Sequence, residues 1–200
     1  PFNLPYCTFL VLPLASFLVI RFLKAPKQYL LGGFAFGLGY FGLTFIWIIN
    51  PFLVDPQKNI WLAPFAYTLF VSLLSLFWAL AFYVSSYFTR DEQENRKKVF
   101  CLSIVFATAE LFRCYLFSGF PWAILSYAWL DTPVSVFVTW LGPYILNSII
   151  IITGFNLFYS SPATSTIKVI FLFAALLGLQ SKYLDRGLEE ANEYLTVRLV

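Results

Sequence analysis

The chain has 200 residues, of which 60% are hydrophobic, 21% are aromatic and only 12% are charged. Soluble domains are about half apolar and about a quarter charged, so this composition excludes a water-soluble globular protein and a disordered one. The net charge of +3 is carried by too few residues to build a nucleic-acid-binding face. A polytopic membrane protein remains.

Apolar segments follow one another along almost the whole chain. We count about six, each compared with the ~20 residues that a helix needs to cross a bilayer. They cover residues 5–20, 29–49, 60–88, 99–116, 134–159 and 167–179. The first and last are short, and the third is long enough to tilt or to extend beyond the bilayer. Within lipid each must be helical, because every backbone N–H and C=O needs a partner in its own segment. The sequence therefore predicts an all-α membrane domain.

The basic residues of the connecting loops indicate the orientation. Alternate loops carry them: Arg21, Lys24 and Lys27; then Arg90, Arg96, Lys97 and Lys98; then Lys168. Such loops face the cytoplasm, which places residues 51–59 and 117–131 outside. The same alternation places everything after the sixth segment, from about Ser181, on the outer side.

The composition changes near the C-terminal end, where charged residues return and residues 195–200 alternate like a strand. We expect a membrane domain over residues 1–180, followed at 181–200 by a linker and the truncated start of a second domain. The sequence contains 0 Met and has no signal-peptide pattern at Pro1, so we expect a fragment. With 0 His, and 3 Cys that lack metal-ligand spacing, we expect no metal or cofactor.

The second apolar segment is rich in glycine and aromatic residues. Gly33 and Gly37 have the G-x-x-x-G spacing that lets two helix backbones approach closely. Tight helix packing is the interpretation we favour. The alternative is a groove lined by aromatic side chains, including Tyr40 and Trp47, that accepts an acyl chain.

The fourth segment carries Glu110 and Arg113, one helical turn apart on one face. Charges within an apolar segment are costly, so they are usually paired or functional. Two interpretations stay open with about equal weight. The pair is an internal ion pair that fixes the helix end, or it anchors a lipid headgroup. For the second, Arg113 is the better phosphate ligand, because a guanidinium binds with two prongs.

A proline- and glycine-containing aromatic segment follows, with Phe120, Trp122 and Tyr127. It predicts an interfacial hairpin, either a plain aromatic-belt loop or the rim of a lipid-entry site. Asp131 is then the expected N-cap of the next helix, with Pro133 in its first turn.

Together these residues resemble the bacterial apolipoprotein N-acyltransferases. The likeness rests on Glu110 and Arg113, on the block Gly119-Phe120-Pro121-Trp122, and on Tyr127 and Asp131. The segment 37–42 resembles the family's glycine–aromatic helix, and Gly142-Pro143-Tyr144 resembles its G-x-Y at a helix start. The end of the chain resembles the first strand of the family's nitrilase-like domain. Departures stand at Cys114, where glycine is usual, at Ser118, where threonine is common, and at Ile145, where a second glycine often follows the tyrosine.

The resemblance implies an enzyme of the bacterial inner membrane that moves an acyl chain from a phospholipid of the phosphatidylethanolamine type. The acceptor is the N-terminal amine of the diacylglyceryl-cysteine of an apolipoprotein, in the final step of lipoprotein maturation. It implies a ping-pong reaction through a cysteine thioester, with a Glu-Lys-Cys triad in a periplasmic nitrilase-like domain beyond Val200. The fragment alone is therefore expected to be inactive.

The predicted lipid-binding residues lie in three regions of the membrane domain. They are Glu110, Arg113, Phe120, Trp122 and Tyr127, with Tyr40 and Trp47 as weaker candidates. A membrane transporter or a non-catalytic membrane scaffold is the alternative function. A transporter is expected to show related halves or helices broken near the midplane, and the sequence shows no internal repeat.

Overall fold

The structure, a computed structural model, describes residues 7–116, 122–132 and 134–159. Every regular element within these residues is a helix, which confirms the predicted all-α fold for this part of the chain. The predicted segment 167–179 and the predicted linker and strand at 181–200 lie outside the described residues.

The first helix, α1, spans Thr8–Phe22, close to the predicted segment. Its 15 residues extend about 22 Å at 1.5 Å per residue, which is less than the ~30 Å hydrocarbon core of a bilayer. It packs mainly on α6 and buries Leu12 and Val19. Gly154 of α6 lies at this contact, where an added Cβ would be 2.6 Å from Leu12 Cδ1 and 3.0 Å from Leu12 Cβ, so a larger residue would require Leu12 to move.

The second predicted segment is a bent pair rather than one straight helix. Helix α2 spans Pro26–Thr44, the 3-10 helix η2 spans Ile46–Leu53, and the two are inclined by 46°. At the bend the Thr44 hydroxyl donates to the carbonyl of Tyr40 at 2.8 Å, a bond that competes with helix propagation. The bend turns Trp47 away from the direction that a continuous helix would give it.

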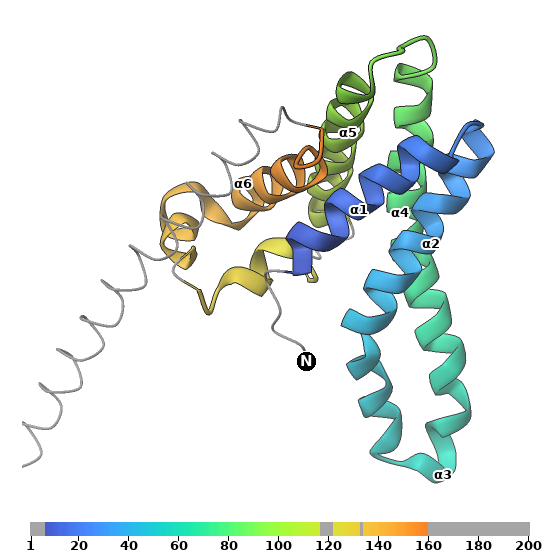
Figure 1. The fold of residues 1–200 in the computed structure, drawn as a ribbon. Coiled ribbons are helices and arrows are strands. Elements are labelled where there is room, and N and C mark those ends of the chain that lie inside the picture. Colours follow the sequence, from blue (N-terminus) through green and yellow to red (C-terminus); the bar gives the residue numbers. More distant parts are fainter. Residues whose placement is uncertain (1–6, 117–121, 133, 160–200) are drawn as a thin grey trace, which may run out of the picture.

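Two elements form the third predicted segment, and a short helical turn in the predicted loop 51–59 precedes it. A short turn of helix, α3 (Pro56–Asn59), leads through the 3-10 helix η3 (Ile60–Leu62) into α4 (Ala63–Phe88). Figure 1 shows α2 and α4 side by side, joined at one end through α3, and this is the largest helix–helix interface of the described residues.

The glycines of α2 explain how closely α2 and α4 approach. A Cβ at Gly33 would lie 2.6 Å from the carbonyl oxygen of Trp78, and one at Gly37 would lie 2.8 Å from the Cα of Ser75. Neither distance is compatible with a side chain. The packing interpretation of the G-x-x-x-G motif is therefore confirmed, because α4 occupies the face that carries these two glycines.

Helices α5 (Asn95–Tyr115) and α6 (Ser135–Phe155) complete the bundle, with the 3-10 helix η4 (Leu125–Trp129) between them. Gly142 interrupts α6 with φ +76°, so a second helical stretch begins at Pro143, in agreement with the resemblance of residues 142–144 to a helix start.

The predicted N-cap of α6 was wrong. Val134 rather than Asp131 occupies the N-cap position, and no side chain caps the helix. The backbone first forms a turn in which the carbonyl and the hydroxyl of Thr132 accept hydrogen bonds from the amides of Ser135 and Val134. Thr132, one residue further along than Asp131, therefore satisfies the amides that precede the helix. Pro133 lies outside the described residues.

The described residues cover five of the six predicted segments wholly or in part, and only some of these are long and apolar enough to cross a membrane. Two helices there are long and apolar enough, Pro56–Phe88 and Phe137–Phe155, and the bent pair of α2 and η2 raises the number to three. Helix α5 is not among them, since it contains charged residues near both ends. Six crossings are therefore not confirmed, whereas a membrane protein with several apolar helices is.

Candidate functional site

The Glu110–Arg113 pair is completely buried on α5. Arg113 Nε donates to Glu110 Oε1 at 2.8 Å, and Nη2 donates to Oε2 at 2.9 Å, so the contact is two-pronged. The exposed fractions are 0% for Glu110 and 1% for Arg113. Spacing along the sequence predicted that both residues share a face, and the structure places them in contact.

Neighbouring aromatic residues complete the surroundings of this ion pair. The indole Nε1 of Trp78, on α4, donates to Glu110 Oε1 at 2.7 Å. The ring of Phe41, on α2, lies 5.3 Å from the guanidinium carbon of Arg113, within the range of a cation–π contact. Trp78 itself is stacked against Tyr40 with ring centroids 4.9 Å apart. Three helices therefore converge on one buried pair of charges.

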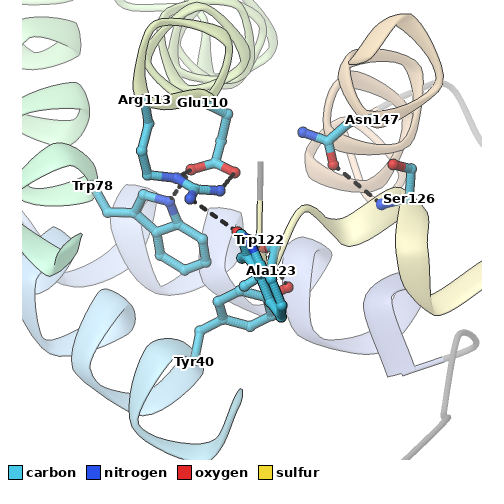
Figure 2. A network of polar contacts seen from close by, with 8 residues as sticks. All are labelled: Tyr40, Trp78, Glu110, Arg113, Trp122, Ala123, Ser126 and Asn147. Carbon is cyan, nitrogen blue, oxygen red and sulfur yellow. Dashed lines mark hydrogen bonds and ion pairs between the residues drawn. The ribbon is translucent and has the colours of Figure 1, made fainter. Parts of the chain in front are cut away.

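The same cluster holds the loop that follows α5. Arg113 Nη1 donates to the carbonyl of Trp122 at 3.0 Å, and the hydroxyl of Tyr40 donates to the next carbonyl, that of Ala123, at 2.9 Å. Figure 2 shows both bonds reaching the loop, one from α5 and one from α2. Ala123 has φ +60°, which an L-residue rarely adopts and which persists only where surrounding contacts fix it. We call Tyr40, Trp78, Glu110 and Arg113 the loop clamp.

The loop clamp leaves the side chain of Trp122 outside the core. Trp122 is 53% exposed and lies against Trp47 of η2, with ring centroids 5.4 Å apart. Trp47 is itself 41% exposed. The bend between α2 and η2 and the clamped loop therefore bring together two aromatic rings that are 75 positions apart in the sequence (122 minus 47).

A second contact holds the 3-10 helix η4. The amide of Ser126 donates to Oδ1 of Asn147, a buried residue of α6, at 3.2 Å. Tyr127, the next residue, is 39% exposed. Figure 2 shows this bond on the side of the loop away from Trp78. The loop is thus attached to α5 at Trp122, to α2 at Ala123 and to α6 at Ser126.

The structure brings five of the seven predicted site residues into one contiguous group: Tyr40, Trp47, Glu110, Arg113 and Trp122. Tyr127 follows in η4, and Phe120 lies outside the described residues. Their lipid-binding role stays a prediction. For Glu110 and Arg113, burial favours the ion-pair interpretation over direct contact with a headgroup.

Sequence reasoning missed Trp78 and Asn147. Each was one more residue of an apolar segment, although a tryptophan N–H and an asparagine amide within such a segment both need a buried partner. The sequence could therefore have indicated that both side chains have buried hydrogen-bond partners, but it does not identify those partners.

Among the described residues, the loop clamp positions a loop backbone but contains no nucleophile paired with a base. Within the described residues no group of three or more His, Cys, Asp or Glu side chains could hold a metal ion. Cys114 is buried next to Arg113 in sequence, and Cys101 is half-buried. This arrangement can therefore fix the loop backbone at Trp122 and Ala123 and expose the aromatic ring of Trp122.

These features define a class of protein: a polytopic helical membrane protein with a buried ion pair that anchors an aromatic loop. The sequence profile of the apolipoprotein N-acyltransferase N-terminal domain matches residues 1–156. The chain belongs to this family.

Curated relatives agree with this assignment. An apolipoprotein N-acyltransferase of Brucella suis is 29% identical over 191 residues, which cover 90% of this chain and 34% of the relative. One from Sinorhizobium fredii is 35% identical over 102 residues, 51% of this chain and 19% of the relative. One from Caulobacter vibrioides is 35% identical over 97 residues, 48% of this chain and 18% of the relative. The chain thus spans about a third or less of the length of these relatives.

Proposed function

We propose that this chain is the membrane-embedded part of an enzyme that transfers an acyl chain from a phospholipid to the N-terminal amine of a diacylglyceryl-cysteine. Family membership supports the reaction class, because the curated relatives are named apolipoprotein N-acyltransferases. In the full reaction a cysteine thiolate attacks the ester of a phosphatidylethanolamine-type donor, a thioester forms, and a lysophospholipid leaves. The amine of the apolipoprotein then attacks the thioester, an amide forms, and the thiol returns.

The described residues contribute positioning rather than bond making. We assign the Glu-Lys-Cys triad to a nitrilase-like domain beyond Val200, so residues 1–200 alone do not catalyse transfer. Their part is to seat the lipidated substrates and to support the catalytic domain at the membrane face. The lipid contacts are assigned to the exposed aromatic side chains of Trp47, Trp122 and Tyr127, and the loop clamp holds Trp122 in place.

One observation carries this assignment. The loop backbone at Trp122 and Ala123 accepts hydrogen bonds from two different helices while the Trp122 ring stays half exposed. Tryptophan is amphipathic and prefers the membrane–water interface. A ring fixed in that way at the predicted outer end of the bundle suits contact with a lipid entering a site.

The assignment is tested by Trp122→Ala in the intact enzyme. Thioester formation from phosphatidylethanolamine and amide formation on a diacylglyceryl peptide are measured separately. We expect both rates to fall about tenfold, the order expected when an aromatic anchor is truncated. Trp140→Ala is the matched control, because Trp140 is 83% exposed on α6 and is expected to leave both rates unchanged. Equal rates for the Trp122 variant and the enzyme without substitution would remove Trp122 from the site.

The proposal also requires a particular orientation of the chain in the membrane. Residues from about Ser181 onward must reach the periplasm, and the enzyme must reside in the inner membrane. Fusions placed after Val200 test this: we expect active alkaline phosphatase and non-fluorescent green fluorescent protein. The opposite pair of results contradicts the proposal.

A further inference from the structure

A cavity of about 760 Å³ lies between the beginning of α5 and the end of α6. Its walls include Arg96, Lys97 and Phe100 from α5, Ile152 from α6, and Asn156, which directly follows α6. This volume is within the range of about 300–1,000 Å³ that is typical of small-molecule sites. The cavity is separate from the loop clamp, whose charged members lie at the other end of α5.

The two cationic side chains of the cavity differ in whether they form ion pairs. Lys97 is paired with Glu94, at 3.3 Å, and with Glu92, at 3.6 Å. Glu94 also lines the cavity. Arg96 has no ion pair among the residues that the structure describes. The two cations and one carboxylate of the described wall leave a net charge of +1, and Arg96 is the cation available to a ligand.

The remaining wall combines apolar surface with fixed polar groups. Phe100 is exposed and Ile152 is half-buried, so both offer apolar contact. Asn156 Nδ2 donates to Ser103 Oγ at 2.9 Å and to the carbonyl of Ile152 at 2.9 Å, which fixes the amide between the two helices. A ligand that fits has one negative charge at one end and a hydrocarbon chain at the other.

We propose that this cavity binds an anionic glycerophospholipid, with the phosphodiester on Arg96 and an acyl chain against Phe100 and Ile152. The guanidinium suits a phosphate because it offers parallel donors. The predicted orientation places the basic loop 89–98 on the cytoplasmic side, so the lipid belongs to the inner leaflet. Basic cavities between helices on that side are suited to anionic headgroups. This site is independent of the acyl-transfer proposal, which concerns the opposite face.

The experiment measures lipid binding to the intact membrane protein, purified in detergent, by native mass spectrometry with phosphatidylglycerol as the probe. Arg96→Gln is expected to weaken binding about tenfold, the effect of losing one charge-assisted contact. Lys98→Gln is the matched control: it removes the same charge two positions away, and Lys98 is not among the described residues of the wall. It is expected to leave binding within about twofold.

A second variant tests the cavity rather than the charge. Thr153→Trp places a large side chain in the wall and is expected to lower phosphatidylglycerol binding while the thermal unfolding midpoint stays unchanged. Competition then identifies the source of the phosphate: phosphatidylcholine and millimolar inorganic phosphate should both fail to displace the probe. The proposal is overturned if either competitor displaces it, if the Arg96 and Lys98 variants bind equally, or if the Thr153 variant binds as well as the unsubstituted protein.

Discussion

Substitution of Glu110 is the sharpest test of the loop clamp. Glu110 accepts three hydrogen bonds: two from Arg113, at 2.8 and 2.9 Å, and one from the Trp78 indole, at 2.7 Å. Glu110→Ala would leave a guanidinium that is 1% exposed without its counter-charge. Breaking a buried ion pair by removing one partner costs about 3–5 kcal/mol, so we expect a loss of that order in the free energy of unfolding.

The double variant separates the ion pair from the surrounding packing. Arg113→Ala alone leaves a buried carboxylate and should cost a similar amount. The variant with both alanines leaves no buried charge but orphans the Trp78 N–H and the Trp122 carbonyl, at about 1–3 kcal/mol each. We therefore expect the double variant to cost clearly less than the sum of the singles, with a coupling energy of about 3 kcal/mol.

The assay is reversible unfolding of the purified protein in mild detergent, by titration with a denaturing detergent, followed by tryptophan fluorescence. Lys97→Gln is the control, because it breaks only the exposed contacts with Glu92 and Glu94 and should not move the midpoint. If the two single losses simply add, to within about 0.5 kcal/mol, the two charges do not stabilise one another and the loop clamp is refuted.

Three further predictions follow from single positions. Gly33→Ala should destabilise the bundle by separating α2 from α4, whereas Gly39→Ala, where no atom lies within 4 Å of the added Cβ, should not; thermal unfolding compares them. Tyr40→Phe removes the bond to the Ala123 carbonyl and should cost about 1 kcal/mol, with slower acyl transfer at an unchanged expression level. The backbone amide of Glu94, then Lys97 and the amide of Gln93, hold the pKa of the Glu92 carboxyl below its usual value. The stabilisation of the loop by the ionised Glu92 carboxylate should therefore be complete above pH 4.5 and be lost as the pH falls through the lowered pKa. The carboxyl chemical shifts of isotope-labelled glutamate measure this titration. An ordinary titration midpoint for Glu92 would contradict the prediction.

Apolar segments of sufficient length were enough to predict most helices. They predicted α4, α5 and α6 to within a few residues at most ends, because a helix in lipid must satisfy its own backbone. They did not predict the 46° bend after Thr44, since a threonine inside an apolar segment does not show in advance whether its hydroxyl will bond backward. The N-cap of α6 failed for a similar reason: Asp131 and Thr132 both suit a cap, and only the turn geometry selects between them.

The candidate site was predicted in part. The one-turn spacing showed that Glu110 and Arg113 would share a face, but both interpretations of the pair satisfied that spacing. What favours one is the donor from Trp78, 32 positions away, and the carbonyl of Trp122 beyond the end of the helix. Such contacts depend on how helices pack, and an amphipathic pattern does not record which helix lies opposite.

The position of the ion pair also indicates why charges are retained there. The carbonyls of Trp122 and Ala123 lie outside regular helix, so near lipid they need donors from elsewhere. A hydrophobic replacement of the pair could pack as well, but it would supply no donor for Trp122. Lysine at position 113 would keep the charge, yet its single nitrogen lacks the planar fork that contacts both carboxylate oxygens and the carbonyl together. Arginine binds both the Glu110 carboxylate and the loop carbonyl with one side chain, and the exposed Trp122 ring is fixed as a consequence.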